Sequence, residues 1–225
     1  MDTKADIHPP AQLIRQVEKA FNERFDGAPR LFSAPGRINI VGEHTDYSEG
    51  WVLPAAINRF CVTAIRPNQS GAIRVLSLNH GEVSLPRQFE RRGDWADYPA
   101  GVCAVLTAAG VDIPGCDVVI GSDVPEGAGV SSSAALEVSF AAALLGAAGH
   151  DAAPFQIARW CQRAENDYVG MPCGIMDQYI SAQGAAGHAL QIDCRSLSHT
   201  AIAIPPGLAF LVIDSLVRHQ LVDGG

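Results

Sequence analysis

The sequence predicts an α+β protein in which strands and helices are grouped rather than strictly alternating. Strand-like runs fill residues 30–78, helical patterns gather between about 97 and 183 around one strand, and strands return from about 188. Apolar residues make up 48% of the 225 positions and charged residues 18%, which is enough apolar material for a sizeable core. Grouped strands followed by clustered helices favour a mixed fold over a βαβ repeat.

The first part of the chain predicts one helix followed by a series of strands. Residues 10–26 place apolar side chains at helical spacing on one face: Leu13, Ile14, Val17, Ala20 and Phe21. A turn at DGAP follows. Five short β-like runs come next: RLFSAP, RINIVG, WVLPAAI, RFCVTAI and AIRVLSL.

The second part of the chain predicts helices around a single strand and then a return to strands. We expect a helix over about 97–110, a strand at 116–122, a long helix ending near 147 and another helix over roughly 154–169. A further helical segment starts near 174. Three strand-like runs close the pattern: HALQIDC, HTAIAIP and LAFLVID.

Composition excludes several classes of function. A net charge of -8 argues against a protein that binds nucleic acid or an anionic membrane, and no apolar run is long enough to span a bilayer. The N-terminal MDTKADIHPP lacks the apolar segment of a signal peptide, so a cytoplasmic protein is expected. Six cysteines without a C-x-x-C pair predict reduced, mostly buried thiols rather than a zinc site.

A glycine–serine turn opens the long helix and predicts a phosphate site. It comprises Gly127, Ala128, Gly129, Val130, Ser131, Ser132 and Ser133. Unpaired N–H groups and the helix dipole favour an anion there, glycine permits its close approach, and serine hydroxyls can donate to phosphate or bind Mg²⁺. The lysine of the Walker motif is absent. The alternative is an ordinary serine cap on an Ala-rich helix.

A polar cluster follows the first strand and suits a neutral polyol. Arg37, Glu43, His44 and Asp46 lie within ten residues. A carboxylate accepts hydrogen bonds from neighbouring hydroxyls, and histidine both donates and accepts. Two alternatives stay open, namely a metal site and a solvated surface turn.

Two acidic residues complete the candidate chemistry. Asp177 lies among Ile175, Met176 and Tyr179, where partial desolvation raises a carboxyl pKa unless a cation such as Arg37 offsets it. An aspartate beside a sugar hydroxyl suits a general base, and Glu165 beside phosphate would suit Mg²⁺. The alternative for Asp177 is a helix cap after a glycine.

Together these segments resemble the galactokinase family of the GHMP class of small-molecule kinases. The matching motifs are GRINIVGEHTDYSEGWVLPAAI, EGAGVSSSAALEV and GMPCGIMDQYIS, with VIDSLVRHQL near the end. The resemblance runs from about residue 29 to 225. It implies a GHMP kinase N-terminal domain, of the ribosomal protein S5 domain 2-like fold, over 1–195. Residues 196–225 would hold the first strands of a C-terminal α+β domain.

The resemblance also implies roles for individual residues. Arg37 would lie beside the anomeric hydroxyl and the γ-phosphate, and Asp177 would be the base or an orienting carboxylate. The galactose hydroxyls would contact Glu43, His44 and Asp46, with Gly174 and Asp177 lining the same pocket. Gly127 to Ser133 would wrap the ATP phosphates, Ser133 and Glu165 would bind Mg²⁺, and Trp95 would stack near adenine.

The activity that the resemblance implies is ATP-dependent phosphorylation of α-D-galactose to galactose 1-phosphate, the first step of galactose catabolism. The family continues into a second domain with another glycine-rich motif and a tyrosine beyond RHQL, so this chain is expected to be a truncated N-terminal portion. The intact protein is expected to be a monomer acting on small molecules. Three alternatives stay open: an inactive sugar and ATP sensor, a kinase for another sugar such as N-acetylgalactosamine, and a non-functional fragment.

Overall fold

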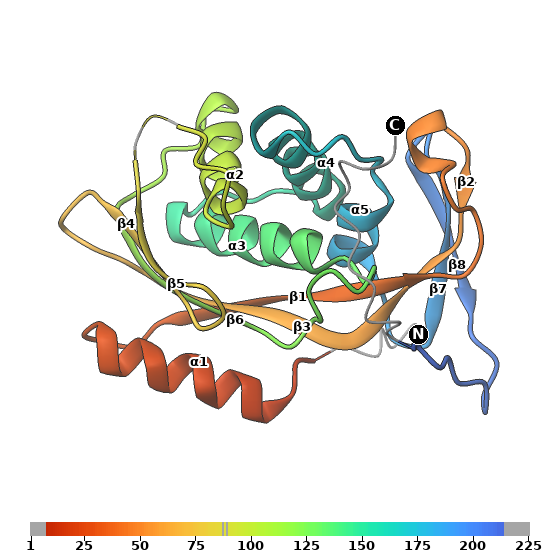
Figure 1. Ribbon diagram of the computed structural model, residues 1–225, viewed down its shortest axis with the longest axis horizontal. Helices are drawn as coiled ribbons and strands as arrows, with labels where there is room; N and C mark the ends of the chain where they lie inside the picture. The colour runs from red at the N-terminus through yellow and green to blue at the C-terminus, as the bar shows by residue number, and fades with distance from the viewer. Residues whose placement is uncertain (1–7, 87, 89, 214–225) are drawn as a thin grey trace.

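The computed structural model describes residues 8–86, 88 and 90–213, and they form one mixed sheet with helices on both faces (Figure 1). The sheet has eight strands in the order β2-β7-β3-β6-β4-β5, with β1 paired to β3 and β8 paired to β7. The strands are β1 (Arg30–Asn39), β2 (Trp51–Val52), β3 (Pro54–Pro67), β4 (Ile73–Ser77), β5 (Gly81–Leu85), β6 (Cys116–Ser122), β7 (His188–Asp193) and β8 (Ser198–Ala203).

Strand β3 is the centre of the sheet because it contacts three neighbours. It pairs antiparallel with β1, with β6 and, at Ala55, with β7. Its side chains alternate between the two faces, as the twofold repeat of a strand requires. Phe60, Val62 and Ala64 contribute to one apolar cluster, whereas Cys61 and Ile65 contribute to the other. Residues 60–65 are therefore buried on both sides.

Helix α1 (Ala11–Arg24) covers one face of the sheet, and the other helices cover the opposite face (Figure 1). The latter are α2 (Asp97–Ala108), α3 (Ser132–Ala148), α4 (Pro154–Ala164) and α5 (Met176–Gln183). Leu13, Val17 and Phe21 of α1 are buried. In the part of the chain that the structure describes, no helix combines the length and apolar character needed to cross a membrane.

The α+β class expected from the sequence is confirmed, and most elements lie close to their expected bounds. In two places, two expected strands form one continuous strand. RLFSAP and the start of RINIVG form β1, and most of WVLPAAI continues into RFCVTAI in β3. Helix α4 continues into a π-helical turn over Glu165–Val169. Strand β5 was not expected, since GEVSL carries few apolar residues and is held by pairing with β4.

The C-terminal expectations have mixed outcomes. The strand expected at LAFLVID is wrong over residues 208–213, which are exposed and form no ladder with any described strand. Apolar residues favour a strand only where a partner edge is present. The division at residue 195 stays a prediction. Strand β8, which follows residue 195 in the chain, pairs along its whole length with β7, which precedes it. VIDSLVRHQL lies mostly outside the described residues.

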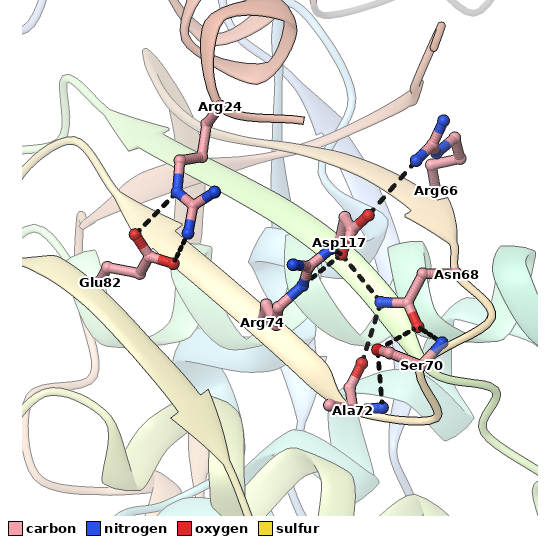
Figure 2. Close-up of polar contacts among 8 residues, drawn as sticks. All are labelled: Arg24, Arg66, Asn68, Ser70, Ala72, Arg74, Glu82 and Asp117. Carbon is pink, nitrogen blue, oxygen red and sulfur yellow. Dashed lines mark hydrogen bonds and ion pairs between the residues drawn. The ribbon is translucent and has the colours of Figure 1, made fainter. Parts of the chain in front are cut away.

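Two neighbouring sets of polar contacts form a cluster in which Asp117 joins strands of the sheet and Arg24 ties the end of α1 to β5 (Figure 2). Asp117 on β6 is 1% exposed and accepts hydrogen bonds from Arg74 at 2.8 Å and Asn68 at 2.8 Å. Arg66 lies 3.4 Å from the other carboxylate oxygen. Arg24, the last residue of α1, makes a two-bond contact with Glu82 on β5 at 2.9 and 2.7 Å. The cluster is structural, since its residues do not line the cavities that hold the candidate site.

Candidate active site

The structure brings the three sequence motifs together around one cavity of about 550 Å³. This acceptor cavity, as we name it, lies between the end of β1, the turn before β2, the glycine–serine turn and the start of α5. All six residues expected at the sugar line it: Arg37, Glu43, His44, Asp46, Gly174 and Asp177. Ala128, Gly129 and Val130 of the glycine–serine turn line it as well.

Arg37 and Asp177, 140 residues apart, form an ion pair in this cavity. Arg37 Nε donates to Asp177 Oδ1 at 2.7 Å, and its terminal nitrogen donates to Oδ2 at 2.8 Å. The side chains are 13% and 27% exposed, so the pair is shielded but open to a ligand. A register shift between Pro35 and Arg37 on β1 marks a bulge, and bulges redirect side chains near functional sites.

Asp177 does not cap its helix. It is the second residue of α5 after Ile175 at the N-cap, and no side-chain cap hydrogen bond is present at this helix start. The alternative that treated Asp177 as a helix cap is therefore wrong. Its carboxylate faces Arg37 instead, which supplies the cation that the sequence analysis expected.

The turn after β1 presents its polar side chains to the mouth of the cavity. Glu43 and His44 are exposed and Asp46 is half-buried. Asn39, which the sequence analysis did not assign, donates a hydrogen bond to Glu43. Gly174 packs directly on the Asp46 carboxylate, because a Cβ at this glycine would lie 2.0 Å from Asp46 Oδ2. Only glycine leaves room for this approach.

The backbone of the glycine–serine turn packs directly against the backbone of β1. Arg37 donates from its backbone N–H to Val130 O at 3.0 Å and from its guanidinium to Gly129 O at 2.6 Å. A Cβ at Gly36 would meet Val130 O at 2.7 Å, so this position requires glycine. Arg37 thus contacts both the turn and Asp177.

A second cavity, of about 240 Å³, lies on the other side of the turn. We name it the donor cavity. Gly127, Ser132, Ser133 and Trp95, all expected at the nucleotide, line it. His80 stacks on Trp95 with ring centroids 5.4 Å apart, and its Nε2 lies 2.8 Å from Glu126 Oε1.

The three serines of the turn do not share one environment. Ser132 and Ser133 line the donor cavity, whereas Ser131 Oγ donates to Asp177 Oδ2 at 2.6 Å. Ser131 occupies the N-cap of α3 with φ 60°, and no side-chain cap hydrogen bond forms there. The alternative of an ordinary serine cap is therefore wrong.

Buried polar groups lie beneath both cavities. Gln178 on α5 donates to Glu165 Oε2 at 2.6 Å and to Glu137 Oε2 on α3 at 3.3 Å. Burial raises the pKa of Glu165 to about 7, and a hydrogen bond with Ser133 only partly offsets it. Burial and the nearby Glu165 raise the pKa of Glu137 well above its usual range. The network joins the helices that carry Ser133, Glu165 and Asp177.

These pKa shifts predict a pH-dependent stability. Since folded Glu165 keeps its proton up to about pH 7 while the unfolded carboxyl loses it near 4.5, its contribution to stability is present at low pH and is lost as pH rises between these values. Glu165→Gln should flatten that fall. We expect chemical denaturation in the presence of a chelator to show that the free energy of unfolding of Glu165→Gln rises relative to that of the wild type as pH increases from 4.5 to 7. For Glu23→Gln, at an exposed glutamate, the curve of unfolding free energy against pH should run parallel to that of the wild type. A Glu165→Gln curve that ran parallel to the wild-type curve would contradict the raised pKa of Glu165.

Sequence reasoning missed several residues at the two cavities. Asn39, Cys173 and Met176 line the acceptor cavity, and His80, Tyr98 and Glu126 line the donor cavity. Cys173 and Met176 lie within two residues of Gly174, so the motif that contains Gly174 was the signal that could have identified them. His80 and Tyr98 carry no local signal, since only the packing of β4 and α2 beside the turn brings them there.

Comparison with known families agrees with this geometry. Residues 19–67 match the galactokinase galactose-binding signature, and residues 97–185 match the N-terminal domain of GHMP kinases. The first range holds the polar turn of the acceptor cavity. The second holds the glycine–serine turn, Glu165 and Asp177.

Individual relatives give the same result. The chain is 42% identical to a Homo sapiens galactokinase over 229 residues, covering 95% of this chain and 57% of that protein. It is 43% identical to the Chloroflexus aggregans galactokinase, covering 88% and 53%. The crystal structure of Lactococcus lactis galactokinase complexed with galactose superposes with a TM-score of 0.81 at 28% identity, covering 85% and 52%.

The chain spans about half the length of the curated relatives it matches. Within that span the two family matches include the polar turn of the acceptor cavity and the glycine–serine turn, whereas four residues that line the donor cavity lie between the matched ranges: Ser77, Asn79, His80 and Trp95. The chain therefore carries the N-terminal domain of the GHMP kinase family together with the galactose-binding signature of its galactokinases.

Proposed function

We propose that this protein transfers the γ-phosphoryl group of ATP to the anomeric hydroxyl of α-D-galactose, giving galactose 1-phosphate and ADP. One observation carries the proposal. Arg37 binds Asp177 and the Gly129 carbonyl in the acceptor cavity, and Gly129 belongs to the glycine–serine turn whose Gly127, Ser132 and Ser133 line the donor cavity, so a single guanidinium contacts both the acceptor carboxylate and the turn that separates the two cavities. Phosphoryl transfer needs such a positioned cation between donor and acceptor.

The acceptor cavity offers the groups that a hexose needs. Glu43 and Asp46 supply carboxylate acceptors for neighbouring hydroxyls, and His44 can donate or accept. A pocket built to hydrogen-bond hydroxyls rejects an epimer that leaves those groups unpaired. The relatives named galactokinase, and the Lactococcus lactis structure complexed with galactose, support galactose as the sugar.

The donor cavity offers groups that suit the phosphates of a nucleotide. Gly127, Ser132 and Ser133 line it at the start of α3, where the helix dipole favours phosphate. Trp95 offers an aromatic face beside them, although His80 stacks on it in this structure. A base that stacks on Trp95 would displace His80 or lie against the edge of this pair.

The residues present also fit a magnesium ion. Glu165 is 5% exposed, burial raises its pKa, and a hydrogen bond joins it to Ser133, so a bound Mg²⁺ would favour its anionic form. Ser133 and Glu165 would hold the ion, and phosphate oxygens and water would complete its shell, as is usual for Mg²⁺. The ion would neutralise phosphate charge.

The chemistry then follows from the protein groups. The anomeric oxygen attacks the γ-phosphorus, the bond from that phosphorus to the β–γ bridging oxygen breaks, and ADP leaves. Asp177 accepts the hydroxyl proton or orients the hydroxyl for attack. Arg37 stabilises the charge on the transferred group. The proposal includes the cytoplasm as the place of action.

The test is product formation by the purified 225-residue chain. We would incubate it with MgATP and galactose, N-acetylgalactosamine, glucose or no sugar, and detect sugar 1-phosphate by ³¹P NMR. We expect product with galactose and none with glucose. Product from N-acetylgalactosamine alone would replace the proposed sugar. Calorimetric binding of galactose without product would contradict transfer by this chain and favour a sensor.

A further inference from the structure

We propose that Ser131 is a positioning residue of the acceptor side, whose hydroxyl fixes the orientation of the Asp177 carboxylate. Its place in the glycine–serine turn predicted a contact with nucleotide instead. The inference rests on the proposed function, because it assigns Asp177 to the sugar hydroxyl.

The first support is the contact itself. Ser131 Oγ donates to Asp177 Oδ2 at 2.6 Å, which is a short, charge-assisted hydrogen bond. Two further donors, both from Arg37, reach the same carboxylate. Together they occupy three of the roughly four acceptor positions of a carboxylate, leaving about one for an incoming hydroxyl. Ser131 therefore determines which position stays open.

The second support is the backbone at Ser131. Its φ of 60° lies in the left-handed region, which a residue with a side chain adopts only at a cost. Gly127 and Gly129 in the same turn have φ of 65° and 70°, and both are glycine. At position 131 the chain retains a hydroxyl in a conformation that glycine would adopt more easily. Among the described residues, the hydrogen bond from this hydroxyl to Asp177 is the gain that offsets this cost.

The third support is that the three serines of the turn face different sites. Ser132 and Ser133 line the donor cavity, and Ser131 does not. The turn therefore has hydroxyls on both sides, two towards the donor and one towards the acceptor carboxylate.

The proposal is tested with Ser131→Ala, Ser131→Gly and, for comparison, Ser132→Ala. We expect both Ser131 variants to lose about 10- to 100-fold in kcat, with the KM for MgATP within about twofold of wild type. Ser132→Ala should raise the KM for MgATP. The melting temperature of Ser131→Gly should stay close to that of wild type, because relief of the left-handed backbone offsets the loss of the hydrogen bond. A purely structural serine would leave Ser131→Gly fully active.

Three results would overturn the proposal. They are wild-type kcat in Ser131→Gly, a raised KM for MgATP with unchanged kcat in Ser131→Ala, and additive effects of Ser131→Ala and Asp177→Ala on the free energy of unfolding. The unfolding cycle needs no turnover. If the wild-type chain makes no product, the proposed function fails for this chain. Two results would still support the positioning role: non-additive effects of Ser131→Ala and Asp177→Ala on the free energy of unfolding, and a loss of affinity for galactose but not for nucleotide in Ser131→Ala.

Discussion

Asp177→Asn is expected to lower kcat for galactose phosphorylation by about 10²- to 10⁴-fold while leaving the affinity for MgATP unchanged. The substitution removes the carboxylate that faces the acceptor cavity and replaces one of its oxygens with an NH₂ group, which cannot accept a hydrogen bond from Arg37. Turnover would be measured by coupled ADP release, and nucleotide affinity by calorimetry. Since Asp177 lies on the acceptor side of the turn, the donor cavity should be intact.

The matched control is Asp151→Asn, at an exposed aspartate in the connection between α3 and α4. It makes the same change in charge away from both cavities and should keep wild-type turnover. The loss of the counter-ion of Arg37 could also disturb folding, so the melting temperature of both variants should be recorded. An Asp177→Asn protein with wild-type kcat would remove Asp177 from its assigned role, whichever sugar is used.

Asp117→Ala is expected to destabilise the fold by about 3 kcal/mol, which corresponds to a fall of about 6–12 °C in melting temperature. Its carboxylate is 1% exposed and joins Arg66, Arg74 and Asn68. Removing it leaves two guanidinium groups without their partner under the end of α1 (Figure 2). Because these groups are 33% and 38% exposed, water recovers part of the loss and the cost stays at the lower end for a broken buried pair.

Glu82→Gln provides the comparison for this cluster. Glu82 makes a two-bond contact with Arg24, yet both side chains are about 40% exposed or more. Exposed pairs contribute at most about 1 kcal/mol, so this variant should melt within a few degrees of wild type. Thermal unfolding followed by circular dichroism would measure both. Equal losses for the two variants would show that burial of Asp117 is not what makes its contact strong.

The local elements were determined by the sequence to a large extent. The helical spacing of Leu13, Val17 and Phe21 predicts α1, and the apolar run after Arg59 predicts the central part of β3. These elements depend on interactions between residues close in the chain. The residues that line the acceptor cavity were predicted through the resemblance of three ordered motifs to the galactokinase family.

Only the tertiary structure decided how those segments meet. Arg37 and Asp177 are 140 residues apart, and nothing local distinguishes a paired aspartate from a helix cap. The different partners of Ser131 and its neighbours depend on the left-handed backbone at one residue and on the position of α5. His80 reaches the donor cavity only because β4 pairs with β6. Contacts of this kind are set by the packing of distant elements, which residue type and spacing alone do not specify.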